Sequence, residues 1–91
     1  MNENSKYLLL QLEKIFIDVL DINDVELSLE SSQETIQEWT SLSNILLISE
    51  IEEKLAMKFL ASEVYLFRTV GDIVDSLLSK GFVSRENQTR W

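Results

Sequence analysis

The sequence contains no cysteine, no histidine and no proline, and it contains only two glycines. Without cysteine and histidine, the chain cannot form a disulfide scaffold, or a zinc or iron–sulfur site built on those residues. It also lacks the His base and the Cys nucleophile that many catalytic triads need. The remaining carboxylates, hydroxyls, amines and phenols are a thin inventory for catalysis, so we predict that the protein is not an enzyme.

Basic side chains are scarce as well. The 91 residues include 16 acids and 8 bases, which gives a formal net charge of -8 at pH 7. An acidic surface repels the phosphate backbone, so we predict no binding of nucleic acid. It favours a partner with a basic surface. The alternative is an acidic surface that only keeps the protein in solution, and the net charge alone does not decide between the two.

The bases are absent altogether between Ile15 and Glu53, where ten of the acids lie. This segment therefore carries a charge of -10, and the rest of the chain carries +2. Within it, residues 21–30 lack the spaced ligands and the turning glycine of a calcium-binding loop. We therefore predict no metal site in this acidic segment.

Long apolar runs are also missing. No stretch is long and apolar enough to suit a membrane span. The first residues, MNENSKY, lack the basic start and the small-residue cleavage site of a secretory signal. We therefore expect a cytoplasmic protein. Its length predicts one small domain with a modest core, and a monomer is the simplest expectation.

Apolar residues at helical spacing predict an all-α fold, a small helical bundle of three main helices and one short helix. The first helix is expected over residues 6–20. It follows an N-terminal segment, residues 1–5, in which Asn4 or Ser5 caps the helix. Residues 21–38 have no helical period and are interpreted as a long loop, held to the core by a few apolar side chains. A loop of this length in a small domain is usually functional.

The second helix is expected to follow Trp39, with Thr40 or Ser41 at its N-terminal edge. Trp39 itself is expected to pack the long loop onto the bundle. The buried face of this helix is predicted to hold Ile45, Leu47, Ile48, Ile51 and Leu55.

Residues 61–66 can form at most a short helix, and the sequence Thr-Val-Gly-Asp at residues 69–72 predicts a capping box for a last helix. Lys80 in the last turn suits the helix dipole, and Gly81 suits the position just after the helix. Residues 82–91 have no period and predict a flexible tail. The buried face of the last helix is expected to hold Val70, Ile73, Val74, Leu77 and Leu78.

Ser41 lies at the start of the second helix, inside the segment that lacks bases. A serine in this position usually caps the helix. Alternatively, its exposed hydroxyl is an attachment point, because the free N–H groups and the dipole of a helix N-terminus favour a nearby phosphate. The residues alone leave both interpretations open.

The residues around Ser41 resemble the signature of the acyl carrier proteins. The resemblance begins with Glu38-Trp39-Thr40-Ser41-Leu42, Ile45, Leu47, Ile48 and Ile51-Glu52-Glu53-Lys54-Leu55. It continues through Met57-Lys58-Phe59, Ala61-Ser62-Glu63 and Thr69-Val70-Gly71-Asp72-Ile73. It covers residues 6–80, and the order and spacing of these motifs are more specific than any one of them.

The resemblance implies that Ser41, flanked by Thr40 and Leu42, carries 4′-phosphopantetheine. A phosphopantetheinyl transferase would donate this arm from coenzyme A. The arm would hold acyl or aminoacyl groups as thioesters, and the carrier domain, residues 6–81, would present them to enzymes with basic docking surfaces. These enzymes would load and transfer the groups in fatty-acid, polyketide or related biosynthesis. A thiol attached after translation fits a chain without cysteine.

The sequence departs from the family pattern at two places. Thr40 stands where the family usually has Asp; it can cap the helix, but it cannot supply a carboxylate to the transferase. The start of the second helix also lacks acids. Leu46 is therefore interpreted either as a margin of the core or as an exposed contact for partner enzymes, with Glu50 and Glu53 adding charge further along. The alternative function is a carrier-like interaction module without the arm.

Overall fold

The first helix, α1, spans Glu3–Leu20 in the computed structural model, which describes residues 3–23 and 26–82. It begins three residues before the predicted start, so Asn4 and Ser5 lie inside the helix rather than capping it, and the predicted N-terminal segment is partly helical. The prediction relies on the repeat of apolar residues, which begins only at Leu8 and therefore does not reveal the polar first turn of α1. Glu3 in that turn interacts favourably with the helix dipole.

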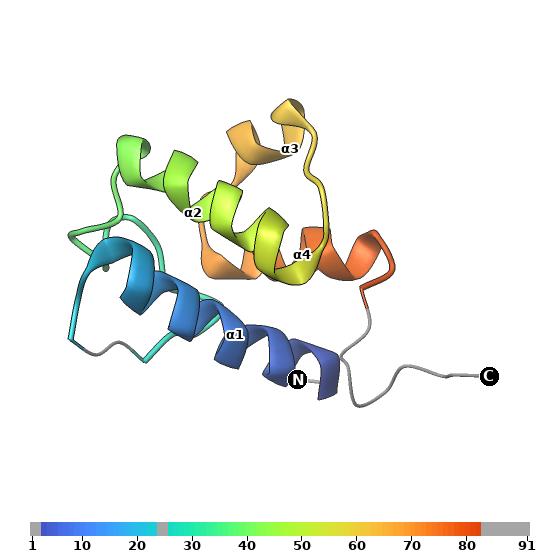
Figure 1. Cartoon of the computed structure of the whole chain (residues 1–91), viewed down its shortest axis with the longest axis horizontal. Helices are drawn as coiled ribbons and strands as arrows, with labels where there is room; N and C mark the ends of the chain where they lie inside the picture. The colour runs from blue at the N-terminus through green and yellow to red at the C-terminus, as the bar shows by residue number, and fades with distance from the viewer. Residues whose placement is uncertain (1–2, 24–25, 83–91) are drawn as a thin grey trace.

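Three further helices follow: α2 at Ser41–Leu55, α3 at Ala61–Leu66 and α4 at Val70–Ser79. Figure 1 shows α1 and α2 running side by side, with α4 behind them and α3 on the side of α2 away from α1. Within the described residues, the β contact is an isolated bridge between Ser32 and Thr69. The predicted all-α bundle of three main helices and one short helix is confirmed. No helix in this part of the chain is long and apolar enough to cross a membrane.

The apolar faces of α1, α2 and α4 meet in one core. Trp39 lies at its centre with 1% of its surface exposed, and its ring meets the Phe16 ring edge to face at 5.0 Å. The Trp39 indole N–H donates to Asn44 Oδ1 at 2.9 Å, so the buried polar atom is satisfied. The prediction that Trp39 packs the loop onto the bundle is confirmed.

The buried face of α2 differs from the prediction at one residue. Leu47, Ile48 and Ile51 are buried and Leu55 packs against the core, but Ile45 is 63% exposed. Asn44 holds the inward position at the start of α2, where it accepts the Trp39 bond. Ile45 lies about 100° further round the helix and therefore points away from the core.

The long loop between α1 and α2 is docked on the start of α4. Leu27 and Ile36 from the loop are buried in the core. The Val70 N–H donates to the Ser31 carbonyl at 2.8 Å, and the Gly71 N–H donates to the Leu29 carbonyl at 2.9 Å. A Cβ on Gly71 would lie 2.8 Å from the Leu29 carbonyl oxygen, so this close approach requires glycine.

The predicted capping box of α4 is confirmed. Thr69 Oγ1 accepts from the Asp72 N–H at 3.2 Å, and Asp72 Oδ2 accepts from the Thr69 N–H at 3.1 Å. Gly81 has a φ of 93°, a left-handed conformation that suits glycine after a helix. Lys80 is the C-cap residue, and Leu78 is only partly buried.

The predicted tail begins with a residue that packs on the bundle. Phe82 contacts the core and its ring stacks on Tyr7, with the two ring centroids 6.1 Å apart. The other residues of the predicted tail, 83–91, lie outside the described part of the chain.

Candidate functional site

Thr40, and not Ser41, caps α2. Thr40 Oγ1 accepts from the Ser43 N–H at 3.2 Å, while Ser43 Oγ accepts from the Thr40 N–H at 2.8 Å. Ser43 Oγ also donates to the Glu38 carbonyl at 2.9 Å, which ties the end of the loop to the helix. This capping box satisfies the Thr40 and Ser43 amides without using the Ser41 side chain.

Ser41 is therefore the first residue of α2, and its side chain is exposed. Within the described residues, the Ser41 hydroxyl has no hydrogen-bond partner, and neither have the backbone N–H groups of Ser41 and Leu42. Unpaired N–H groups and the positive end of the helix dipole attract anions. This donor set suits a phosphate group attached to or lying beside the hydroxyl.

A groove runs beside the Ser41 hydroxyl. Its lining includes Glu30 and Glu34 of the loop, together with Tyr65 of α3 and Arg68 of the connection to α4. Among the described residues, Arg68 is the only basic residue that lines this groove. The groove thus joins three segments that lie far apart in the sequence, and the site is not a property of α2 alone.

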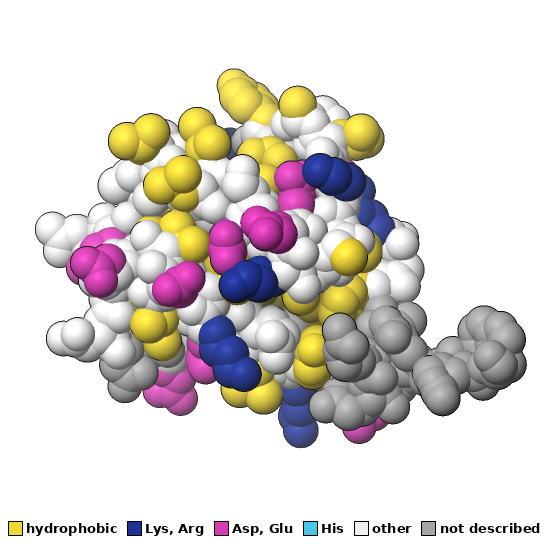
Figure 2. Space-filling model, in the orientation of Figure 1, with side chains coloured by type: hydrophobic (Ala, Val, Ile, Leu, Met, Phe, Trp, Pro, Cys, Tyr) yellow, Lys and Arg dark blue, Asp and Glu magenta, His cyan; other side chains and the backbone are white. Residues whose placement is uncertain are grey.

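An exposed apolar patch lies on α2 next to Ser41, formed by Leu42, Ile45 and Leu46. Their exposed fractions are 74%, 63% and 56%, respectively. Figure 2 shows hydrophobic side chains gathered over α2 and also over α3. Of the two interpretations left open for Leu46, the exposed one agrees with the structure. Contiguous exposed apolar surface on a small domain commonly marks an interaction site.

The acids of α2 lie beyond this patch and have different environments. Glu50 pairs with Lys54 one helical turn away, at 3.0 Å, and this contact raises the pKa of the Lys54 ammonium. Glu53 is exposed. Glu52 Oε2 accepts from the Phe59 N–H at 2.9 Å, which fixes the connection that leaves α2. Of the two acids predicted to meet partners, Glu50 is thus partly neutralised within the domain.

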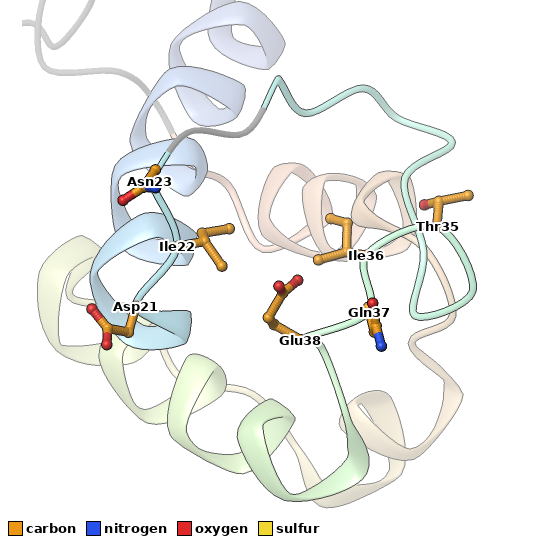
Figure 3. Close-up of a pocket in the computed structure, with 7 residues that line it drawn as sticks. All are labelled: Asp21, Ile22, Asn23, Thr35, Ile36, Gln37 and Glu38. Atoms are coloured by element: carbon orange, nitrogen blue, oxygen red, sulfur yellow. The ribbon is translucent and has the colours of Figure 1, made fainter.

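A second hollow, shown in Figure 3, lies where α1 ends and the loop returns towards α2. The Glu38 and Ile22 side chains point towards it, whereas Asp21 points away. Within residues 3–23 and 26–82, no group of His, Cys, Asp or Glu could hold a metal ion. The hollow contains no reactive pair, and Ser41 does not line it.

Sequence reasoning found Ser41 but missed Arg68, because the two residues belong to different segments that only the fold brings to one groove. It also missed the ion pair between Glu63 of α3 and Lys80, with Nζ and Oε1 2.6 Å apart. Hydrogen bonds from Lys80 and from the Leu60 N–H lower the pKa of the Glu63 carboxyl. A charge-patterning argument based on helical spacing cannot find a pair so far apart in sequence.

Comparison with known proteins agrees with the fold. No protein-family model matches the sequence. The chain is similar to a holo acyl carrier protein from Geobacter metallireducens, whose structure was solved by solution NMR. The two share 32% sequence identity with a TM-score of 0.70, over 90% of this chain and 94% of the other.

This similarity in sequence and fold defines the class of protein as a carrier, and the chain belongs to the acyl carrier protein family. Members of this family are non-catalytic carriers, so the protein is a carrier protein and not an enzyme. The predicted membership in the acyl carrier protein family is thereby confirmed.

Proposed function

We propose that the protein holds acyl or aminoacyl groups as thioesters on a 4′-phosphopantetheine arm at Ser41 and presents them to biosynthetic enzymes. The observation that carries this proposal is the unpaired Ser41 hydroxyl at the start of α2 in a member of the acyl carrier protein family. The similar Geobacter protein is described as a holo acyl carrier protein, which supports the same cofactor here.

The residues around Ser41 fit the arm. In the loading step, Ser41 Oγ would form a bond to the phosphorus next to pantetheine in coenzyme A and would give its proton to a basic group of the transferase. The bond between the two phosphates breaks, and adenosine 3′,5′-bisphosphate leaves. The N–H groups of Ser41 and Leu42, which have no partner within the described residues, would hold the new phosphodiester. When bound, the arm supplies a thiol, which this chain lacks.

Partner enzymes, including a phosphopantetheinyl transferase, would bind the face of α2 beside Ser41. The apolar patch of Leu42, Ile45 and Leu46 provides contact area next to the arm. Glu50 and Glu53 add negative charge further along α2, where a basic partner surface would meet them. This arrangement predicts recognition by apolar contact near the arm and by charge at a distance. We propose that the protein works in this way as a cytoplasmic monomer.

Intact mass after incubation with coenzyme A and a broad-specificity transferase tests the attachment. The wild-type chain should gain the mass of one phosphopantetheine, and Ser41→Ala should gain none. Ser49→Ala is a matched control, because Ser49 is also an exposed serine on α2. Absence of the added mass from the wild type, or its persistence in Ser41→Ala, would show that the proposal is wrong.

A carrier-like interaction module without the arm is the second candidate, and Thr40 is the observation that favours it. Thr40 caps α2 but leaves no carboxylate before Ser41. If Thr40 prevents modification, Thr40→Asp should gain the arm under conditions in which the wild type does not. Equal modification of both proteins would instead favour the carrier function.

A further inference from the structure

Arg68 is a basic residue in the lining of the groove that contains Ser41, and it has no side-chain partner within the described residues. Lys54 and Lys80 form ion pairs with Glu50 and Glu63. The Arg68 guanidinium, in contrast, makes no ion pair or hydrogen bond with any side chain among residues 3–23 and 26–82. It lines the same groove as the Ser41 hydroxyl. The groove therefore contains a cation whose hydrogen-bond donors are all available.

The backbone of Arg68 is held firmly, although its side chain is exposed. The Arg68 N–H donates to Asp72 Oδ2 at 2.8 Å. The next residue, Thr69, forms the β bridge with Ser32, and the Val70 N–H is bonded to the loop. The side chain of Arg68 thus extends from a fixed wall of the groove, and substitution of that side chain leaves these backbone contacts intact.

The acidic residues that line the groove explain why a cation is useful there. Glu30 and Glu34 line the groove, so a phosphodiester on Ser41 would add a negative charge close to two carboxylates. Like charges in a partly enclosed groove repel one another, and an adjacent cation offsets that repulsion. The planar guanidinium of arginine also matches phosphate geometry with two parallel hydrogen bonds.

We propose that Arg68 binds the phosphodiester of the arm on Ser41 and directs the arm along the groove, past Tyr65. This inference rests on the proposed attachment at Ser41. Arg68 is a positioning residue: it takes no part in the loading chemistry and fixes where the loaded arm lies. The N–H groups of Ser41 and Leu42, which have no partner within the described residues, would provide further donors for the same phosphate.

Phosphorus NMR of the loaded full-length protein tests the contact directly, because the arm contributes a single phosphodiester signal. Intact mass first establishes that the wild type, Arg68→Gln, Arg68→Lys and Lys58→Gln are all fully loaded. Lys58 is an exposed base that does not line the groove, so its variant is the matched control. We expect the phosphorus signal to move in Arg68→Gln, to return towards the wild-type position in Arg68→Lys, and to stay in place in Lys58→Gln.

Proton–nitrogen spectra of the arginine side chains give an independent readout. The Arg68 Nε–Hε signal, identified by its loss in Arg68→Gln, should shift when the apo protein is loaded. An unchanged Arg68 signal, or the same phosphorus signal in wild type and Arg68→Gln, would overturn this inference while leaving the arm in place. No added mass on the wild type would overturn the attachment itself, so the two failures are distinguishable.

Discussion

Two helices of this protein begin with the same local motif but have very different surroundings. Both α2 and α4 start with a threonine cap and a reciprocal capping box. At α4, the next two N–H groups, of Val70 and Gly71, donate to carbonyls of the loop. At α2, the corresponding N–H groups of Ser41 and Leu42 have no partner within the described residues.

This difference shows that the same capping motif can begin a helix whose first turn is covered by the loop or one whose first turn is left open. A capping box satisfies only part of a helix N-terminus, and the remaining N–H groups must bond to something else. At α4 the loop covers them, and the helix start becomes part of the scaffold. At α2 they stay open beside a serine hydroxyl and a groove. What covers the first turn, and not the cap itself, distinguishes the two sites.

The largest effect is expected from Gly71→Ala at the covered site. The added Cβ would lie 2.8 Å from the Leu29 carbonyl oxygen, a backbone atom that cannot move without shifting the loop. The free energy of unfolding should fall by about 2 kcal/mol, as for other overpacked sites. Urea denaturation measures this change. Wild-type stability in Gly71→Ala would show that the loop does not hold α4 as described.

Removal of the caps should have an intermediate effect that is similar at both helices. Thr40→Ala and Thr69→Ala each remove a hydroxyl that accepts a backbone N–H bond. Each should lower the free energy of unfolding by about 1 kcal/mol. Thr40→Asp is the control, since aspartate also caps helices. A loss in Thr40→Asp as large as that in Thr40→Ala would contradict the capping role.

The far end of α4 is tied to α3 by Lys80 and Glu63, and this contact should respond to pH. The contact lowers the pKa of Glu63 in the folded protein. Its stabilisation is therefore complete above the carboxyl pKa of the unfolded chain, about 4.3, and is lost as the pH falls through the lower folded value.

Lys80→Gln should accordingly be less stable than wild type at pH 7, and thermal melts should show the gap closing in acid. Lys54→Gln is the control, because its pair with Glu50 is an exposed contact within one helix. Such pairs contribute little to stability. A gap in Lys80→Gln that stays constant down to strong acid would exclude the ionised Glu63 as its cause.

The smallest effect on stability is expected at the open site. Leu42→Ser replaces a side chain that is 74% exposed, so the free energy of unfolding should change by less than about 0.5 kcal/mol. The same variant should slow acyl transfer by a partner enzyme, because the apolar patch loses contact area. Transfer at the wild-type rate, with stability also unchanged, would argue against a docking role for this patch.

Much of this structure could be predicted from local patterns in the sequence. The capping box at Thr69 and Asp72 and the glycine after α4 depend on neighbouring residues, and both are confirmed. The predicted start of α1 is wrong, because the first turn of this helix is polar and an apolar repeat cannot reveal it. The prediction that Ile45 is buried is wrong, because Asn44, bonded to Trp39, takes the inward position at the start of α2.

The candidate site was only half visible in the sequence. The position of Ser41 at a helix start follows from the motif around it. Arg68 could not be found in the same way, because its place beside Ser41 depends on how the loop docks on α4. The sequence predicts a functional loop held to the core by a few apolar side chains, but it does not predict the main-chain bonds between the loop and α4. The contacts of the loop with α4 bring the starts of α2 and α4 together, although local sequence patterns give no sign that these two helix starts are neighbours.

The hydrogen bonds that dock the loop on α4 use main-chain atoms, and this leaves the exposed side chains of the loop free to vary. Carbonyls of Leu29 and Ser31 accept the two bonds, and any residue can supply a carbonyl. The exposed acids Glu30 and Glu34 are thus decoupled from folding, so mutation could reset the charge beside the groove without loss of the scaffold. Gly71 of α4 is the exception. Its main chain lies so close to the Leu29 carbonyl of the loop that it has no room for a side chain.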